Sequence, residues 1–446
     1  MILENNYDII CRDGSLGALL TAFFLAKSGK KVLLLPPLSS PAQKPSYLLP
    51  LIAGFPRQLL AQAGLLTEGI LCKQSNWFSW TDGQHVFNCP SVFSDRMPVL
   101  SSFMGDNFPW FQSHFTDFQN IWDIIDTVMS NGLMIPAVGL KDHGKILMAL
   151  VKYQELLQNR RMNAENFYSD TSLPEWLSNF FASMVPQISL FRYENLPLVS
   201  FAYGIATMFQ DAELVNLENL QNYVKESILE KGGKTSPADY QVIFDGKWYI
   251  GIGTEGKVEI RSRAFITDSD EKTLKSEIPP MHQRRDFFRQ FVCQQKGIAL
   301  NRLYGHIAGM KKLPETGRWF YNANNSLQAV MLQRTMASEG LDINVYFSST
   351  SPGHDPTDFT TKLLARLPEL DILDASRINF QPQTVEKEWG CQPKLPPVMG
   401  GAFLPVISTY KKFYHVGWEN LPGFGFSGLV YAARKTADRI ILNEYR

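Results

Sequence analysis

The sequence is poor in cysteine, and its cysteines have no metal-binding spacing. Five occur among 446 residues, an odd number spread along the chain without a C-x-x-C pair. This excludes a disulfide framework or a paired-cysteine zinc site and predicts reduced, buried thiols in a cytoplasmic protein. The seven histidines are also scattered, so they predict no metal site and no catalytic triad. The cysteines are Cys11, Cys72, Cys89, Cys293 and Cys391.

The chain also lacks an excess of charge of either sign. It carries 43 lysine and arginine residues against 43 aspartate and glutamate residues, a formal net charge of +0. A neutral balance gives no support for binding to nucleic acid or to an anionic membrane surface. We therefore expect no nucleic-acid partner.

Long hydrophobic runs are missing as well. None reaches the roughly 20 apolar residues that a transmembrane helix needs, so we expect no transmembrane segment. The apolar segment after Arg12 could be taken for a signal peptide, but acidic residues precede it and Lys27 follows it. We interpret the N-terminus as the first strand of the fold.

What is present is the composition of an ordinary globular protein. Apolar residues make up 45% of the chain, charged residues 19% and aromatic residues 12%. A chain of this length is long enough for two domains, each with its own core.

The stretch from Tyr7 to Pro36 has the pattern of a β-strand, an α-helix and a second β-strand. The run Tyr7–Cys11 is short and apolar, as expected for a buried parallel strand. The run Ser15–Ser28 is apolar on nearly all sides, which predicts a buried helix that Gly29 ends. Val32–Leu35 is the predicted second strand.

This unit does not carry the residues of a dinucleotide site. Such a site needs G-x-G-x-x-G across the first turn and an acidic residue after the second strand. The segment Asp13–Ala18 reads D-G-S-L-G-A instead, and Pro36 follows the second strand. A carboxylate at Asp13 repels one phosphate charge by about 4 kcal/mol at ~4 Å and an effective dielectric constant of about 20. Asp13 and Ser15 are also good helix N-caps, so we favour a turn that caps itself over tight dinucleotide binding.

Two further glycine-rich segments imitate phosphate-binding loops. Segment 139–146 resembles a P-loop, but Ile146 stands where a serine or threonine must hold magnesium. Segment 251–256 matches G-x-G-x-x-G, but a strand pattern follows it, so we interpret it as a hairpin turn. We expect nucleotide binding at neither segment.

The segment Phe108–Ser130 has the clearest helical periodicity. Its large apolar residues recur in steps of four and three and form one continuous face. We favour the core of a helical domain; the alternatives are the wall of a cavity for a large apolar ligand, or a surface that meets a membrane or a partner. The face consists of Phe111, Phe115, Phe118, Trp122, Ile125 and Met129.

Other elements follow from shorter patterns. Strands are predicted on both sides of Asp82-Gly83, between Trp77 and Phe87. The remaining predicted strands are 240–244, 247–252, 257–266 and 342–347, and the remaining predicted helices are 57–64, 173–185, 217–231 and 357–366. Near the C-terminus, the strand Phe413–Gly417 runs into a glycine-rich turn, and a helix follows from Leu429 to about Asn443. A glycine-rich turn that opens a helix can bind an anion.

Together these pieces resemble the phytoene desaturase/amine oxidase superfamily of FAD-dependent oxidoreductases. The resemblance covers most of the chain in order: the βαβ opening, a helix ending at Gly232-Gly233 before a strand meander, the segment Leu363–Pro368, and the terminal strand, turn and helix. In that family the closing pattern is V-G-D, a few residues, then P-G-x-G-x-x-G and an alanine-rich helix under the flavin. The matching residues are Val416, Gly417, Pro422, Gly423, Gly425 and Gly428.

The chain departs from the family at both ends of the cofactor. The family's Asp next to the flavin is Trp418 here, and Ser40–Pro45 replaces a Gly-Gly-Arg loop. Both early glycines and the ribose-binding acid are also missing. We expect Trp418 to fill part of the volume that the cofactor would vacate, because an empty cavity of that size is destabilising. These departures from the family pattern therefore predict no FAD binding or weak FAD binding. The Rab GDP-dissociation inhibitors, which resemble flavoproteins but act as binding proteins, are a precedent at the level of the fold alone.

The resemblance implies an α/β fold with a discontinuous Rossmann-like FAD-type domain and a second, mixed α+β substrate domain. The first domain is expected at 1–75, 205–270 and 395–446, and the second at 76–204 and 271–394. No catalytic residue and no metal ligand can be named. If a cofactor binds, its contacts are expected at Asp13, Gly14, Ser15, Gly17, Gly417, Trp418, Pro422, Gly423 and Gly425.

Three hypotheses for function follow. We favour a non-catalytic binding protein for an apolar small molecule, or a partner protein of an active paralogue. The alternative is an active FAD-dependent oxidoreductase that acts on a lipophilic substrate. The third hypothesis is a structural subunit of a larger assembly.

Overall fold

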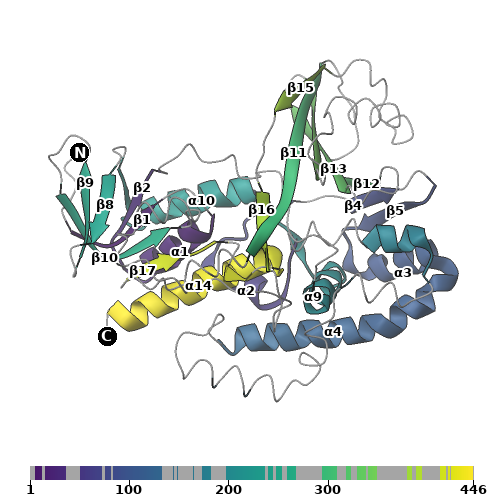
Figure 1. Cartoon of the computed structure of the whole chain (residues 1–446), viewed down its shortest axis with the longest axis horizontal. Helices are drawn as coiled ribbons and strands as arrows, with labels where there is room; N and C mark the ends of the chain where they lie inside the picture. Colours follow the sequence, from purple (N-terminus) through teal and green to yellow (C-terminus); the bar gives the residue numbers. More distant parts are fainter. Residues whose placement is uncertain are drawn as a thin grey trace.

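The computed structural model describes most of the N-terminal half, the strands of the C-terminal half and the C-terminal helix (Figure 1). The described residues are 6–12, 16–36, 51–72, 76–81, 84–132, 173–181, 197–236, 240–244, 248–253, 259–267, 294–308, 318–322, 329–337, 340–348, 379–383, 388–393, 412–417, 420–421 and 423–444, with the single residues 144, 148 and 164.

The first sheet is seven-stranded and contains the predicted βαβ opening. Its order is β7-β2-β1-β10-β9-β8, and β17 pairs with β10 beside β9. The strands β7, β2, β1, β10 and β17 are parallel to their neighbours, whereas β8, β9 and β10 form an antiparallel meander. The strands are β1 (Asn6–Arg12), β2 (Val32–Leu35), β7 (Lys234–Thr235), β8 (Tyr240–Phe244), β9 (Tyr249–Gly253), β10 (Glu259–Thr267) and β17 (Phe413–His415).

Three helices pack together on one side of this sheet. They are α1 (Leu16–Lys27), α10 (Leu217–Glu230) and α14 (Gly425–Glu444). Every residue of α1 from Leu16 to Ala26 is buried, as its apolar sequence predicts. α1, drawn in purple in Figure 1, contacts both α10 and the yellow helix α14. A helix apolar on all sides is stable here because neighbours cover it on all sides.

The second sheet is eight-stranded and lies at the other end of the molecule (Figure 1). Its order is β15-β11-β14-β13-β12-β4-β5, and β16 pairs with the first half of β11. The β4–β5 hairpin confirms the two strands predicted around Asp82-Gly83. The strands are β4 (Asn76–Thr81), β5 (Val86–Pro90), β11 (Gln294–Ala308), β12 (Arg318–Asn322), β13 (Ala329–Ala337), β14 (Gly340–Ser348), β15 (Asn379–Gln383) and β16 (Glu388–Pro393).

A helical layer connects the two sheets. The long helix α4 has the predicted bounds, Phe108–Ser130, and packs against α9 (Leu198–Met208). The short helix α2 (Gly54–Ala63) lies between α4 and α14, and α3 (Phe93–Met104) follows β5. A 3-10 turn at Gly105–Asn107 links α3 to α4, and β3 (Leu51–Ile52) pairs with β6 (Glu213–Leu214) beside α9.

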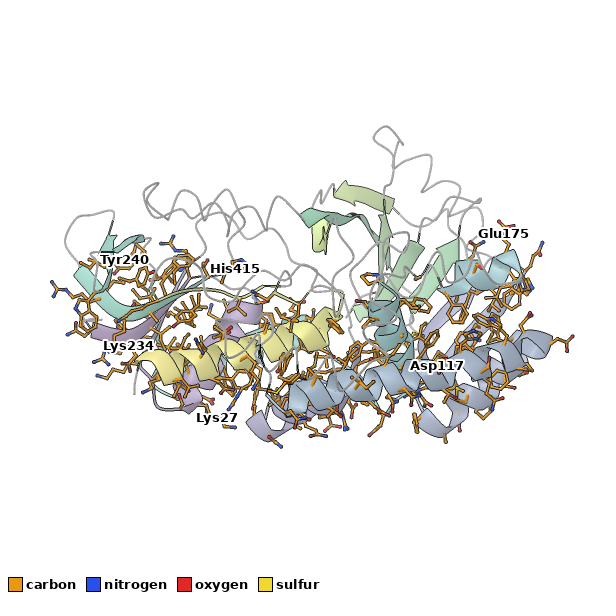
Figure 2. All side chains as sticks on the ribbon, turned by 60° about the horizontal axis from the view of Figure 1, so that its bottom comes forward. Lys27, Asp117, Glu175, Lys234, Tyr240 and His415 are labelled. Carbon is orange, nitrogen blue, oxygen red and sulfur yellow. The ribbon has the colours of Figure 1, made fainter. Side chains whose placement is uncertain are left out.

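The apolar face of α4 is part of the core. All six residues predicted to form it are buried, with exposed fractions between 0 and 8%. Phe111 and Phe115 contact Phe209, and Phe118 contacts Phe201 edge-on. Asp117 lies on the outer side of α4, and Lys27 and Glu175 are likewise at the surface (Figure 2). The structure therefore supports the core interpretation.

Some predicted boundaries were wrong. The C-terminal helix begins at Gly425, four residues before the predicted start at Leu429, and α2 begins at Gly54 before the predicted start at Arg57. In both cases the helix begins at a glycine with a left-handed backbone, with φ +53° at Gly425 and +58° at Gly54. The predicted helix 173–185 is described only as far as residue 181, and segment 139–146 and the predicted helix 357–366 lie outside the described residues apart from residue 144. The G-x-G-x-x-G at 251–256 does join antiparallel β9 and β10.

Candidate functional site

The candidate site lies at the carboxyl ends of the parallel strands of the first sheet. The chain leaves β1 through α1 to β2 on one side, while β10 and β17 lie on the other side. This is a topological switch point, the place where open α/β sheets bind ligands. The three polar residues that end β1, β10 and β17 are Arg12, Thr267 and His415, and none is more than 1% exposed.

Arg12 ties the end of β1 to the antiparallel meander. Its Nη2 donates to the Tyr240 carbonyl oxygen at 2.5 Å, and its guanidinium lies 5.9 Å from the centre of the Phe265 ring. Tyr240 and His415 both lie within the sheet region in Figure 2. The strand end is thus held by a buried cation, which a prediction from hydrophobic pattern alone overlooked.

Gly17 allows α1 to approach the end of β17. A Cβ atom at this position would lie 2.7 Å from the Val416 carbonyl oxygen and 2.8 Å from a methyl group of Leu429 on α14. Thr21, one turn later, donates to the Gly17 carbonyl at 2.9 Å and approaches the Ala433 carbonyl at 3.4 Å. Gly17 therefore serves helix-to-strand packing, the role that the last glycine of a dinucleotide fingerprint has.

The turn after β17 is closed by its own side chain. The Gly417 amide donates to Asn420 Oδ1 at 2.6 Å, and the Asn420 amide donates back to the Gly417 carbonyl at 3.3 Å. Asn420 is fully buried. Because this amide already has an acceptor within the protein, it is not available to a ligand unless Asn420 moves.

The following turn needs its glycines for two different reasons. Gly423 and Gly425 have φ values of +87° and +53°, a left-handed backbone that other residues rarely adopt. Gly428 has no room for a side chain, since its Cβ would lie 2.7 Å from the Leu421 carbonyl oxygen. These constraints place the first turn of α14 against the turn that follows β17.

The N-terminus of α14 is buried. The amides of Gly425, Phe426 and Ser427 donate to no acceptor among the described residues. The Tyr203 ring meets the Phe424 ring edge-on at 5.2 Å, and its buried hydroxyl lies close to Ser427. Burial raises the pKa of Tyr203, so its hydroxyl keeps its proton at neutral pH. This end of the site therefore offers backbone amides as hydrogen-bond donors next to the aromatic rings of Tyr203 and Phe424.

A second helix start, which is half-buried, belongs to α2, and α2 contacts α14. The Phe55 amide, in the first turn of α2, donates to Asp126 Oδ1 on α4 at 2.6 Å. Gly54 has φ +58°, and a Cβ there would lie 2.2 Å from the same oxygen. The Phe55 ring contacts Tyr431 of α14 at 6.4 Å. Burial raises the pKa of Asp126, the Phe55 amide acts in the opposite direction, and Asp123 adds to the rise.

Of the predicted site residues, the structure brings together those that it describes. Gly17 lies against the turn at Gly417, and Gly423 and Gly425 lead into α14 beside it. Asp13, Gly14, Ser15, Trp418 and Pro422 lie outside the described residues, so the proposed capping by Asp13 stays a prediction.

Sequence reasoning missed Asn420, Tyr203 and Asp126. Asn420 had a recognisable signal, because asparagine commonly closes a turn through a hydrogen bond between its side chain and a nearby backbone group. Tyr203 and Asp126 had none, since their partners lie far away in the sequence.

The described residues contain neither a metal-binding group nor a membrane helix. No three His, Cys, Asp or Glu side chains among them could hold a metal ion. No helix in the described part of the chain is both long and apolar enough to cross a membrane. Location in the cytoplasm stays a prediction.

Solved structures with the same fold include several oxidases. Cyclohexylamine oxidase from Brevibacterium oxydans IH-35A is 13% identical, with a TM-score of 0.61 over 99% of this chain and 100% of that chain. An oxidoreductase from Methanosarcina mazei is 12% identical, with a TM-score of 0.59 over 97% and 100%. Putrescine oxidase bound to putrescine is 10% identical, with a TM-score of 0.62 over 98% and 99%. No family model matches the chain, and no curated protein matches its sequence.

These similarities establish the fold. The chain shares the Rossmann-like fold of cyclohexylamine oxidase and putrescine oxidase, and the predicted fold class is confirmed. At 10–13% identity the likeness extends no further than the fold.

Proposed function

We propose that this chain uses the fold of FAD-type oxidoreductases as a binding protein for an apolar ligand and does not hold FAD with ordinary affinity. The expected Rossmann-like domain (1–75, 205–270, 395–446) provides the site, and residues 76–204 and 271–394 form the substrate-type domain. Partnership with an active paralogue remains part of this proposal, because a fold without its cofactor can still present a protein-binding surface.

The observation that carries the ligand-binding part is the buried start of α14. Its amides at Gly425, Phe426 and Ser427 have no acceptor among the described residues. A buried helix N-terminus needs acceptors, and its dipole favours an oxygen atom with negative partial charge. The neighbouring Phe424 and Tyr203 rings favour an apolar body. A ligand with an oxygen-bearing head and an apolar body suits this arrangement.

The other cofactor contacts support weak or absent FAD binding. The Gly417 amide is engaged by Asn420, which would have to move before a ligand could use it. At the first turn, Asp13 and Ser15 replace glycines, and Pro36 replaces the acid that binds the ribose. FAD would span both the turn after β1 and the start of α14. Its diphosphate would then face Asp13 and Ser15 in place of glycines, even if its flavin fitted at α14.

A second candidate is an FAD-dependent oxidoreductase acting on a lipophilic substrate. The similarity to cyclohexylamine oxidase favours it, because it covers 99% of this chain and 100% of that protein, substrate-type domain included. In this case Gly17 and α14 would hold the cofactor, which would supply the redox chemistry. The residues of this chain would then position the substrate and exclude water.

An absorption spectrum distinguishes the two candidates. We expect the full chain, purified without added cofactor, to be colourless and to remain so after incubation with FAD and gel filtration. A flavin band that survives gel filtration at a stoichiometric ratio would establish the oxidoreductase candidate and end the first.

Asp13→Ala is the informative variant for this measurement. If Asp13 caps α1, its loss lowers the free energy of unfolding by about 0.5–2 kcal/mol and confers no FAD binding. If stability is unchanged and the variant retains FAD through gel filtration, Asp13 is a repulsive gate on a working cofactor site.

A further inference from the structure

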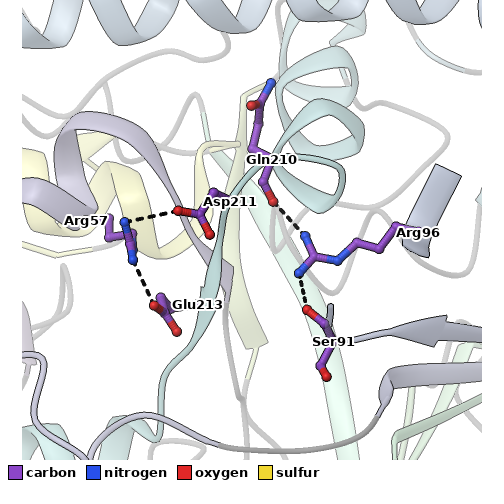
Figure 3. A network of polar contacts seen from close by, with 6 residues as sticks. All are labelled: Arg57, Ser91, Arg96, Gln210, Asp211 and Glu213. Carbon is purple, nitrogen blue, oxygen red and sulfur yellow. Dashed lines mark hydrogen bonds and ion pairs between the residues drawn. The ribbon is translucent and has the colours of Figure 1, made fainter. Parts of the chain in front are cut away.

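The link between α9 and β6 is held by two arginines from different parts of the fold. The link runs from Met208, the last residue of α9, to Glu213, the first residue of β6. Arg96 on α3 reaches its first half and Arg57 on α2 reaches its second half, as Figure 3 shows. We call this arrangement the arginine clamp.

Arg96 forms the buried half of the arginine clamp. Its side chain is 2% exposed, and its guanidinium lies 3.3 Å from the centre of the Trp77 ring in β4. Burial lowers the pKa of Arg96 to about 10, with Cys89, Asp211 and Glu213 acting in the opposite direction, so it is charged at neutral pH. It donates to four backbone carbonyls, those of Pro90 at 3.1 Å, Ser91 at 2.5 Å, Met208 at 3.4 Å and Gln210 at 2.6 Å.

The acceptors of Arg96 belong to two separate segments. Pro90 ends β5 in the second sheet and Ser91 follows it, whereas Met208 ends α9 and Gln210 lies two residues after it. A cation at the last carbonyls of a helix is favoured by the helix dipole. Backbone carbonyls carry no formal charge, so salt screens these bonds less than it screens an ion pair between exposed side chains.

Arg57 forms the second part of the arginine clamp, and its side chain is partly exposed. Its Nη2 lies 2.8 Å from Glu213 Oε1, and its Nη1 lies 3.5 Å from Asp211 Oδ2. The side chains of Arg57 and Glu213 are 33% and 32% exposed, and that of Asp211 is 77% exposed. Ion pairs of this kind are weak and salt-dependent.

We propose that the arginine clamp is a hinge in which the hydrogen bonds of Arg96 stay formed and the ion pairs of Arg57 can open. Arg96 fixes the end of α9 to the second sheet, and Arg57 holds the following residues to α2 through ion pairs that open and close. Arg57 is therefore a positioning residue for β3 and the start of α2, because Glu213, which Arg57 contacts, is the residue of β6 that pairs with Ile52 of β3. Since β3 and α2 pack against α14, opening of these ion pairs moves the wall of the candidate site.

Hydrogen exchange of the full chain, read by mass spectrometry, tests the hinge. We expect Arg57→Gln to speed exchange in peptides covering residues 51–60 and 211–216 by about two- to fivefold, the range that a half-exposed ion pair supports. Exchange in α9 should not change. Raising the salt concentration from about 0.05 to about 0.5 M should reproduce this effect in the wild type and add nothing to the variant.

Two control variants separate positioning from general loosening. Arg57→Lys keeps the charge and should restore most of the protection, whereas Asp211→Asn removes only the longer, more exposed contact and should change exchange little. Exchange that is unaltered by Arg57→Gln, or that rises equally in α9 and β5, would overturn the proposal. This outcome is independent of whether the chain binds FAD.

Discussion

The Asp126 carboxylate caps helix α2 through the amide of Phe55, which lies 71 positions earlier in the chain, at 2.6 Å. Ala53, the residue at the N-cap position of α2, makes no side-chain cap. An N-cap usually comes from the adjacent residue, whereas here α4 provides it across the helical layer. The contact thus joins α2 to α4 beside α14, and it leaves room only for glycine at position 54.

Substitutions of Asp126 should separate its charge from its hydrogen bond. Asp126→Asn keeps an oxygen acceptor for the Phe55 amide and removes the buried charge, whereas Asp126→Ala removes both. We expect the alanine variant to be less stable than the asparagine variant by about 0.5–2 kcal/mol, the usual effect of losing a cap. Urea denaturation of both variants measures the difference, and equal stability would show that the hydrogen bond contributes nothing.

The pH dependence of stability should follow the raised pKa of Asp126. In the folded chain this pKa lies above the ordinary value of 3.8, so the folded state binds the proton more tightly than the unfolded state. The wild type therefore loses stability from this group as pH rises from 3.8 through the higher folded pKa. The free energy of unfolding of Asp126→Asn relative to the wild type should increase over that pH range. A difference that does not change with pH would contradict a raised pKa of Asp126.

Gly17 should not tolerate alanine. The added Cβ would lie 2.7 Å from the Val416 carbonyl oxygen, a backbone atom that cannot move without shifting the turn after β17. Overpacking of this kind lowers stability by about 1–3 kcal/mol. The matched control is Gly69→Ala, where the Cβ would meet nothing within 4 Å and the effect should stay within about 0.5 kcal/mol. Thermal unfolding of the two variants is the measurement; similar melting temperatures would argue against close packing at Gly17.

Phe115 should be essential for stability. It is 5% exposed, stacks on Phe111 at 5.2 Å and meets Phe209 edge-on at 5.5 Å. Phe115→Ala should lower the free energy of unfolding by about 3–5 kcal/mol. Thr116→Ala, on the exposed side of α4, should change it by less than about 0.5 kcal/mol. A loss below about 1 kcal/mol at Phe115, combined with weaker binding of a ligand or partner, would instead assign the aromatic face to an interaction surface.

Local periodicity made several elements predictable. α4 has its predicted bounds because Phe111, Phe115 and Trp122 recur at helical spacing against a polar opposite face. The strands Asn6–Arg12 and Val32–Leu35 are buried on both faces, so they read as continuous apolar runs. The glycines of the C-terminal turn were recognised from their spacing, although the reason for each one was not.

Contacts between distant segments were beyond prediction. The sequence around Arg96 contains no sign that its guanidinium would be buried, because its four acceptors are main-chain carbonyls. Nor does the pattern of α14 indicate a start at Gly425, since glycine has low helix propensity and its left-handed backbone there, with φ +53°, is a feature of the folded chain. Asp13 and Trp418 lie outside the described residues, so the expectation of weak FAD binding at these two positions rests on the sequence alone.

The sequence by itself determined the βαβ opening, the long aromatic helix and the replacement of the early cofactor glycines, because hydrophobic period and residue type act locally. The tertiary structure decided which backbone amides near the candidate site already have a hydrogen-bond acceptor within the protein. Asn420 closes the turn at Gly417, and Asp126 caps α2, whereas the amides at the start of α14 have no acceptor among the described residues. A hydrogen bond depends on distance and direction between two groups, and only the folded chain brings such groups together.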